Sequence, residues 1–273
     1  MEKKRQHIIP NCYLKSWCDP HAPIGQTYIW RISKDGQTKR KKSPEKSFRE
    51  SDRYTVKLAE GGRGLAVEDA LGSIESRFVR VLTTVRQLAP LSPEDRAVLC
   101  LFAAAMHSRS CSNGDHWKGQ YENWYRHVLD AENAYRTRHT RSDELSELIV
   151  NAHGQTATWG IQIETPRLMK MNLTIIHCDD VFGFITSDDP CVWFNEDVLK
   201  SPKRLRIPAL GQLNIEVTLP LTPHRLLFIS HHDFPEYWHV GEDVVDQLNL
   251  RTRALCTKEF ISLTGEVRQS WLD

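Results

Sequence analysis

Hydrophobic and polar positions change their spacing twice along the chain. Up to about residue 60, short runs rich in aromatic and β-branched residues alternate with turn residues, as in Thr27–Ile32 followed by Lys34-Asp35-Gly36. From residue 64 to about 155, apolar residues recur every three or four positions, which is the period of an α-helix. Short apolar runs return between residues 170 and 265. The pattern predicts an α+β fold in which antiparallel strands from both ends of the chain pack on a central helical bundle.

The helical part contains one segment with almost no polar positions. Ser92 can cap its N-terminus, Pro93 fits the first helical position, and the run Ala97–Met106 is apolar nearly throughout. A helix of this kind is buried on most of its sides, so we expect it at the centre of the bundle. Other helices are expected over residues 65–85, 115–135, 142–154 (ended by Gly154) and, near the C-terminus, 244–257.

Several short strands are expected in the last third. Leu173–Cys178 and Val181–Ser187 flank the turn-forming pair Asp179-Asp180 and are predicted to form a hairpin. Residues 215–221, 225–230 and 259–263 have the composition of further strands. Because the chain shows no internal repeat, we expect a single domain that is strand-rich over 1–60, helical over 64–155 and strand-rich over 170–265.

Composition narrows the class of protein without indicating an activity. The net charge is +1, so no overall electrostatic attraction to nucleic acid or anionic lipid is expected. No apolar run approaches the roughly 18 residues of a membrane span, and the charged start lacks the apolar core of a secretion signal. The 7 cysteines are scattered without a Cys-x-x-Cys pair, which is typical of a reducing compartment. We expect a cytoplasmic protein with no membrane partner.

A basic run follows the first predicted hairpin turn. Lys39, Arg40, Lys41 and Lys42 are consecutive in the chain. Such a run can be the solvated edge of a hairpin, where charge prevents pairing with other chains. It can also contact the phosphates of a nucleic acid. The sequence favours the first interpretation and leaves the second open.

Two glutamates lie on the first long helix beside its apolar stripe. Glu68 and Glu75 are seven residues apart, about two turns or roughly 10 Å along the axis, so both carboxylates lie near one face. The stripe, which contains Leu71, Ile74 and Phe78, must face the core. The glutamates therefore lie either at the solvated edge of the stripe, the commoner outcome, or in a site that draws them inward.

Two other candidates lie where apolar elements end. Asp188 follows an apolar strand that Pro190 terminates, and an acid there can bind a metal, act as a base, or bond the backbone of its own turn. Arg109, with His107 two positions before it, ends the buried helix. A cation at that end complements the helix dipole, and an arginine can also clamp a carboxylate or a phosphate.

These elements together resemble a known family. The chain begins with His7-Ile8-Ile9-Pro10-Asn11-Cys12-Tyr13-Leu14, and the glutamate helix, Arg109 and the run Ile185–Pro190 follow in order. This arrangement is similar to the family catalogued as domain of unknown function 4238, whose hallmark is a His-x-x-Pro-x-x-Tyr-Leu start. The resemblance extends from about His7 to Ile261.

The resemblance implies which positions matter more than what they do. Residue by residue, it covers His7, Pro10, Tyr13, Leu14, Glu68, Glu75, Arg109, Ser187, Asp188, Pro190, Pro220, Pro223 and Asn249. One departure is that Ser110-Cys111 stands where the family usually has Thr-Pro after the arginine. Polar residues that recur as a set from distant segments usually converge on one site.

The first functional hypothesis is a divalent-metal-dependent hydrolase that acts on phosphodiesters, like a nuclease. Glu68, Glu75 and Asp188 would hold Mg²⁺ or Mn²⁺, which prefer oxygen ligands. His7 would act as a general base or a proton shuttle, and Arg109 would neutralise charge on a phosphate in the transition state. The basic run at residues 39–42 would then attract a nucleic acid or nucleotide.

The second hypothesis is a non-catalytic sensor or interaction module. The same His, Glu, Asp and Arg side chains would then form a buried network that fixes the N-terminal strand to the rest of the fold. Aromatic residues would bind a partner, namely Trp193, Phe194, Tyr237 and Trp238. Convergence of His7, Glu68, Glu75, Arg109 and Asp188 in one cleft would favour the first hypothesis over the second.

Overall fold

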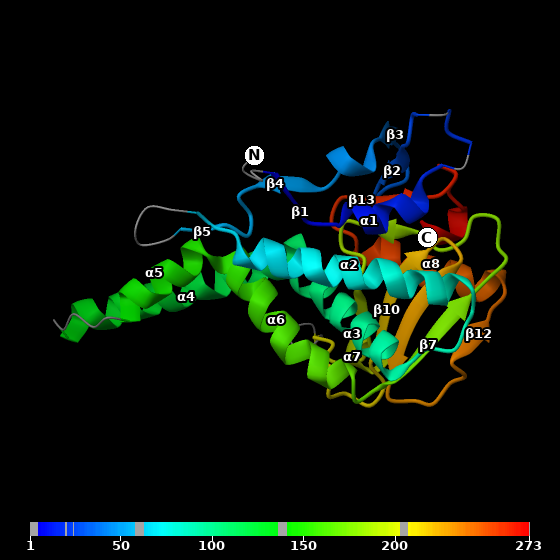
Figure 1. The fold of residues 1–273 in the computed structure, drawn as a ribbon. Helices are drawn as coiled ribbons and strands as arrows, with labels where there is room; N and C mark the ends of the chain where they lie inside the picture. The colour runs from blue at the N-terminus through cyan, green and yellow to red at the C-terminus, as the bar shows by residue number, and fades with distance from the viewer. Residues whose placement is uncertain are drawn as a thin grey trace.

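The computed structural model describes residues 5–19, 21–23, 25–57, 63–135, 141–202 and 207–272. The described part contains eight α-helices, with strands before and after the main helical region (Figure 1). The predicted α+β class is therefore confirmed, and so are the positions of the strands at both ends of the chain. Within the described part, none of the helices combines the length and the apolar character needed to cross a membrane.

The larger sheet is built from the last third of the chain. Its strand order is β12-β7-β11-β10-β9, and all neighbours are antiparallel except β12 and β7, which are parallel. The strands are β7 (Asn172–His177), β9 (Val192–Phe194), β10 (Glu216–Thr222), β11 (Arg225–Ser230) and β12 (Tyr237–His239).

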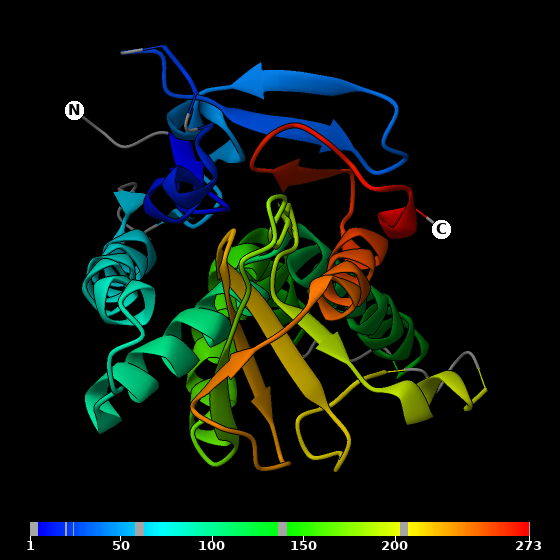
Figure 2. The same ribbon diagram turned by 90° about the vertical axis from the view of Figure 1, so that its right-hand side faces the viewer.

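Successive residues of this sheet face two different cores. On β7, Ile175 belongs to the main apolar cluster with helices α2 (Ala66–Arg86) and α3 (Pro93–Ser108), whereas Ile176 belongs to a second cluster with Val245 of α8 (Glu242–Leu255). Such alternation follows from the period of two in a strand. Figure 2 shows α8 on one side of the sheet and α2 and α3 on the other.

A four-stranded sheet joins segments from both ends of the chain. Its order is β3-β2-β13-β8, with all neighbours antiparallel. The strands are β2 (Ile29–Ser33), β3 (Lys39–Lys42), β8 (Thr186–Ser187) and β13 (Glu259–Ser262). The predicted hairpin is β2-β3, and its turn places Gly36 at a φ of 74°, where glycine is favoured. Two-stranded pairs complete the N-terminal part, namely β1 (Arg5–His7) with β4 (Arg49–Ser51) and β5 (Val56–Lys57) with β6 (Arg63–Gly64).

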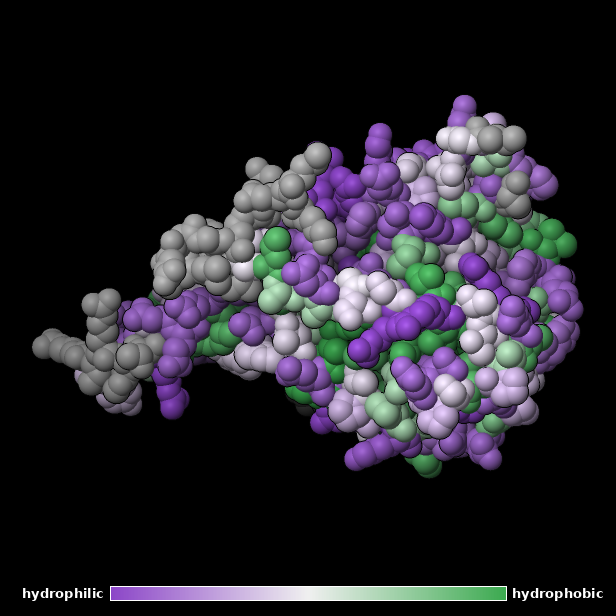
Figure 3. Space-filling model, in the orientation of Figure 1, coloured by the Kyte–Doolittle hydropathy of each residue, from purple (hydrophilic) through white to green (hydrophobic). Residues whose placement is uncertain are grey.

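The helical region surrounds α3, as its composition predicts. Ser92 and Asp95 form a capping box, Pro93 occupies the first turn, and the helix is buried along most of its length. Two helices, α4 (Cys111–Tyr135) and α5 (Arg141–Val150), extend away from the body of the molecule (Figure 1). The remaining helices are α1 (Asn11–Leu14), α6 (Ala152–Leu168) and α7 (Glu196–Leu199). The face of the molecule in Figure 3 is mostly hydrophilic, with hydrophobic residues in small groups.

The N-terminal segment is part of the core. Tyr13 and Trp17 are fully buried. The Tyr13 hydroxyl is 2.6 Å from Thr186 Oγ1, and Trp17 Nε1 donates a hydrogen bond to the carbonyl oxygen of Phe184 at 2.9 Å. The start of the chain is thereby fixed to the strand-rich end, about 170 residues later in the sequence.

The predicted hairpin over residues 173–187 is wrong. β7 pairs with β11 and β12, whereas β8 lies in the other sheet against β13. The predicted turn at Asp179-Asp180 is present, because Asp180 Oδ1 accepts hydrogen bonds from the backbone N–H groups of Phe182 and Gly183 at 2.8 and 2.9 Å. Strand β11 pairs with all six residues of β7, from Arg225 opposite His177 to Ser230 opposite Asn172, and this long-range partner displaces the local one.

The predicted helix end at Gly154 is also wrong. The helical pattern continues in α6 to Leu168, and the break lies at Asn151 instead. Gly160, further along α6, has a specific role in packing. A Cβ at Gly160 would lie 2.7 Å from Ser108 Cβ, so this glycine lets α6 pack closely against the C-terminal end of α3.

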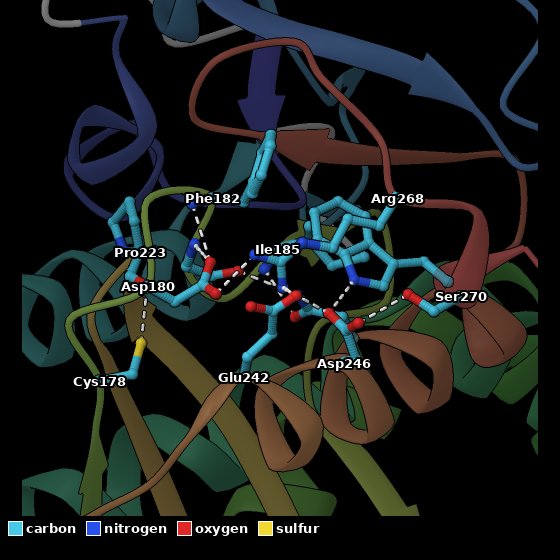
Figure 4. Close-up of polar contacts among 12 residues, drawn as sticks. Cys178, Asp180, Phe182, Ile185, Pro223, Glu242, Asp246, Arg268 and Ser270 are labelled. Carbon is cyan, nitrogen blue, oxygen red and sulfur yellow. Dashed lines mark hydrogen bonds and ion pairs between the residues drawn. The ribbon is translucent and has the colours of Figure 1, made fainter.

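The C-terminal residues are held by one arginine. Arg268 Nη2 donates to Asp180 Oδ2 at 2.6 Å, and its Nη1 donates to Asp246 Oδ1 at 2.7 Å (Figure 4). The guanidinium also lies over the Phe182 ring, 4.6 Å from the centroid. Trp271 Nε1 donates to the same oxygen of Asp246 at 2.7 Å. Arg268 therefore offsets part of the charge of the two aspartates and links the β7–β8 connection, α8 and the end of the chain.

Candidate functional site

Four of the five residues predicted to converge do so. His7, Glu68, Glu75 and Arg109 line one pocket of about 330 Å³, which we call the N-terminal pocket. β1 supplies the histidine, α2 supplies both glutamates, and Arg109 caps the C-terminus of α3. Asp188 does not line this pocket and belongs to a different one.

Arg109 connects three segments in the N-terminal pocket. Its residue is 3% exposed. Nη1 donates to Glu75 Oε1 at 2.8 Å, and Nη2 donates to the backbone carbonyl of His7. The Tyr54 hydroxyl in turn donates to the carbonyl of Arg109 at 3.3 Å. Of the two roles open for this residue, the structure places it as a carboxylate clamp that fixes strand β1 to helices α2 and α3.

His7 and Glu68, which also line this pocket, differ in the hydrogen bonds that they make. His7 Nε2 is 3.0 Å from the carbonyl oxygen of Glu45, so Nε2 carries the proton and donates, which leaves Nδ1 as an acceptor. Burial lowers the pKa of His7, which favours the neutral ring. Glu68 Oε2 is buried and has no hydrogen-bond partner among the described residues.

Asp188 is committed to the backbone of a distant segment. Its Oδ1 accepts from the N–H of Thr257 at 2.8 Å, and its Oδ2 accepts from Lys258 and Glu259 at 2.7 and 3.2 Å. Burial raises the pKa of Asp188 although these three hydrogen bonds act in the opposite direction. The carboxylate thus anchors the chain at the start of β13 to the end of β8.

The predicted metal ligands do not form one set. Glu68 and Glu75 share the N-terminal pocket, Asp188 lies elsewhere, and Glu75 is paired with Arg109. Across the ranges that the structure describes, no group of three or more His, Cys, Asp or Glu side chains could hold a metal ion. No ligand set for Mg²⁺ or Mn²⁺ can therefore be assigned to these residues.

The basic run forms strand β3 at the edge of the four-stranded sheet, and its side chains are exposed. Arg40 pairs with Glu259 at 2.6 Å, and Lys39 lies 3.4 Å from Glu266. The Lys41 ammonium lies 4.8 Å from the centroid of the Trp30 ring. Lys42 lines the pocket of about 470 Å³ that also contains Asp188. The position matches the hairpin-edge interpretation, and binding of nucleic acid by this run stays a prediction.

A second polar cluster lies at the C-terminal end of α3, facing α6. His107 Nδ1 is 2.9 Å from Glu164 Oε1, and both side chains are largely buried. The imidazole ring stacks on the indole of Trp193, with the ring centroids 4.0 Å apart and the planes at 11°. Since Nδ1 is engaged, Nε2 is the nitrogen that remains for another partner.

Asp189 brings a second titratable group to the same place. It and His107 line a cavity of about 500 Å³, which we call the His107 cavity. The Ser112 hydroxyl donates to Asp189 Oδ2. Burial raises the pKa of Asp189 to about 6, and the nearby Asp188 adds to the shift, while Ser112 and His107 oppose it.

The His107 cavity therefore contains a histidine oriented by a carboxylate and an acid that titrates near neutrality. A positioned base next to a proton donor is the arrangement that general acid–base catalysis requires. The sequence contained a signal for two of these residues, because His107 and Asp189 lie in the segments considered around Arg109 and Asp188. Glu164 gave no signal, since the part of α6 that carries it was not expected to be helical.

The fold and this cavity define the molecule as a mixed α+β protein with a histidine–carboxylate site between helices. Comparison with family models matches residues 5–266 to the protein of unknown function family DUF4238. The match covers nearly the whole chain, so the chain belongs to this family, and the resemblance noted from its motifs is confirmed. No curated protein and no solved structure gave a match.

Proposed function

We propose that this protein is a hydrolase whose reaction centre is the His107 cavity. The observation that carries the proposal is the contact of His107 Nδ1 with Glu164 in the same cavity as Asp189, the acid with a pKa of about 6. Hydrolysis needs a base to activate water and an acid to protonate the leaving group. His107 and Asp189 supply one of each.

His107 is assigned as the general base. The carboxylate of Glu164 accepts the Nδ1 proton, which fixes the tautomer with a lone pair on Nε2. Stacking on Trp193 restricts the rotation of the ring. A base held in one orientation in this way takes a proton from water without first losing conformational entropy.

Asp189 is assigned as the general acid. With a pKa of about 6, a substantial fraction of this residue is protonated in mildly acidic to neutral solution, whereas an ordinary aspartate is ionised there. The proton would pass to the leaving group while Ser112 continues to donate to Oδ2 and stabilises the carboxylate that forms. The expected rate falls as the pH rises above about 6, because the acid loses its proton.

We also propose a substrate class, a partner and a cofactor for the hydrolase. A phosphodiester is one candidate substrate, a nucleic acid or nucleotide is one candidate partner, and Mg²⁺ or Mn²⁺ is one candidate cofactor. The sequence predicts catalytic roles for His7, Arg109 and Asp188. We do not propose them as catalytic residues, because all three make hydrogen bonds to other parts of the protein.

The alternative hypothesis receives support at the N-terminal pocket. There, Arg109 binds Glu75 and the backbone of His7, which is what a structural network would do. We propose this role for the N-terminal set and the chemical role for the His107 cavity. The two proposals concern different residues, so variants can test them separately.

The test is hydrolysis of a panel of p-nitrophenyl compounds by the purified full chain. The panel contains bis(p-nitrophenyl) phosphate, p-nitrophenyl phosphate and p-nitrophenyl acetate, each with and without Mg²⁺ or Mn²⁺. We expect His107→Gln and Asp189→Asn each to reduce kcat by roughly 100-fold or more, since general acid–base groups contribute on this scale. His127→Gln is the matched control, because His127 is an exposed histidine of α4. Absence of turnover on the whole panel, or unchanged rates in both cavity variants, would overturn the proposal.

A further inference from the structure

An aromatic cavity adjoins the proposed reaction centre. It has a volume of about 340 Å³ and lies between α4 and α6, and we call it the aromatic slot. A cavity of this size is suited to a small molecule or to one group of a larger one. The residues that line it are Asn113, Trp117, Tyr121, Trp124, Thr156, Trp159, Gly160, Ile163 and Glu164.

The slot has a row of aromatic rings along one helix. Trp117, Tyr121 and Trp124 follow each other at a spacing of four and three residues on α4, so they share one face. Their ring centroids are 6.0 and 5.8 Å apart. Trp159 faces the slot from α6. The three tryptophans remain 39%, 47% and 43% exposed in chain order, which is unusual for such large apolar side chains.

Two residues that line the slot each carry a buried polar atom without a partner among the described residues. Glu164 Oε2 and Thr156 Oγ1 make no hydrogen bond within the described part of the chain, although these residues are only 9% and 5% exposed. A buried carboxylate oxygen without a donor is costly, so such an atom points to a missing ligand. Glu164 is also the sole charged residue among those that line the slot.

We propose that the aromatic slot binds an organic ammonium group. A cation is attracted by the π-electrons on the faces of tryptophan and tyrosine, and a quaternary ammonium in an aromatic site is the best-known form of this interaction. It also compensates the charge of Glu164 at Oε2. An anion would be repelled by that carboxylate, and a neutral apolar group would leave its charge uncompensated.

The slot and the His107 cavity share three residues, namely Asn113, Trp117 and Glu164. Glu164 therefore lines both cavities and contacts His107 through Oε1, while its Oε2 is buried without a partner among the described residues. The inference rests on the proposed function in one respect, since it makes the ammonium group the recognised part of the substrate. A substrate held there by its cationic end would present its adjoining part to His107 and Asp189.

The experiment compares choline with its neutral isostere 3,3-dimethylbutan-1-ol, by isothermal titration calorimetry on the full chain. We expect choline to bind about tenfold more tightly than the alcohol, because several partly exposed ring faces and the Glu164 carboxylate attract the cation together. Trp159→Ala and Trp124→Ala should each weaken choline binding by roughly two- to fivefold, as expected for partly exposed rings. Glu164→Gln should bring the two affinities close together. Trp30→Phe, on β2, is the control and should bind as the native chain does.

The outcomes separate this inference from the proposed function, because binding is measured without turnover. His107→Gln should bind choline normally even if hydrolysis is lost. Equal affinities for choline and the alcohol would overturn the ammonium assignment, and so would the absence of detectable choline binding. Tighter binding of adenosine, a neutral aromatic compound, than of choline would also overturn it. If His107→Gln loses hydrolysis and the native chain does not bind choline, the hydrolase proposal stands. The assignment of an ammonium group to the substrate is then wrong.

Discussion

Asp188 and Asp189 are adjacent in the chain, yet their carboxylates face different pockets. Asp188 accepts three backbone hydrogen bonds from residues 257–259, whereas Asp189 accepts one from Ser112 in the His107 cavity. The strand ends at this point, and successive side chains of an extended segment point in opposite directions. One acid therefore stabilises the fold and its neighbour is available for chemistry, which two substitutions can separate.

Replacement of Asp189 by asparagine should remove activity and increase stability from about pH 4 upward. The pKa of Asp189 is about 6 in the folded protein against 3.8 ordinarily, so the folded state binds this proton more tightly. Below about pH 4 both states are protonated and the group contributes nothing; as the pH rises from about 4 to 6 the unfolded state ionises first, and stability falls. Above about pH 6 the full cost remains, at most about 3 kcal/mol for a partly buried group.

The measurement is urea denaturation of native chain and Asp189→Asn at several pH values. The asparagine side chain does not titrate. We therefore expect the variant to become more stable than the native chain between about pH 4 and 7 and to remain more stable at higher pH. A native chain whose unfolding free energy is independent of Asp189 over this range would contradict the raised pKa. Such a result would also remove the acid from the proposed mechanism.

Replacement of Asp188 by alanine should cost stability. The variant leaves the N–H groups of Thr257, Lys258 and Glu259 without their acceptor, and we expect a loss of roughly 2–4 kcal/mol in the free energy of unfolding. Asp188→Asn should recover part of it, because the amide oxygen can still accept. The free energy of unfolding and the rate of hydrolysis are measured on the same variant. If Asp188→Ala keeps native stability but loses hydrolysis, Asp188 acts in catalysis and not in stabilising the fold.

Replacement of Arg109 by methionine tests the structural network of the N-terminal pocket. Removal of the guanidinium leaves Glu75 and the carbonyl of His7 without a donor, so we expect a loss of about 3–5 kcal/mol. A lysine should rescue only partly, because one ammonium cannot reproduce both contacts of the guanidinium. Thermal unfolding compares the two variants with Arg77→Met as control, since Arg77 is an exposed arginine of α2. Equal stability of all three would show that the pocket does not hold β1 in place.

Sequence patterns predicted those parts of the molecule that depend on local interactions. The buried helix α3 followed from its capping residues Ser92 and Pro93 and from its apolar run, and the β2-β3 hairpin followed from its turn. The convergence of His7 with Glu75 and Arg109 was predicted from the resemblance to the family, which groups polar residues from distant segments. Local signals failed where a distant partner decided the pairing, as for β7, which joins β11 instead of the nearby β8.

The contact between His107 and Glu164 was not predicted, for a related physical reason. His107 and Glu164 are 57 residues apart and meet through the packing of two helices, which neither local sequence indicates. Gly154 resembled a helix end, so Glu164 was not placed on a helix at all. Asp188 and Asp189 could not be distinguished either, because which carboxylate meets three backbone amides depends on where residues 257–259 lie.

The packing of α3 on α6 connects the fold to the proposed chemistry through Gly160. A Cβ at this position would meet Ser108 Oγ and would lie 2.7 Å from Ser108 Cβ, so Gly160→Ala should push the two helices apart. His107 and Glu164 are neighbours of this contact, one on each helix, and their hydrogen bond should lengthen. We expect a stability loss of about 1–3 kcal/mol and a fall in hydrolysis and choline binding together.

The double variant Ser108→Gly with Gly160→Ala provides the compensating change. The double variant has its glycine on α3 instead of α6, which again leaves space for the two helices to pack closely. Both the unfolding free energy and the activity should therefore recover relative to Gly160→Ala alone. Ser108 makes no side-chain hydrogen bond within the described part of the chain, so its loss adds little cost of its own. If stability recovers but hydrolysis does not, the spacing of α3 and α6 is not what positions Glu164 on His107, and the base would have to be oriented by another group.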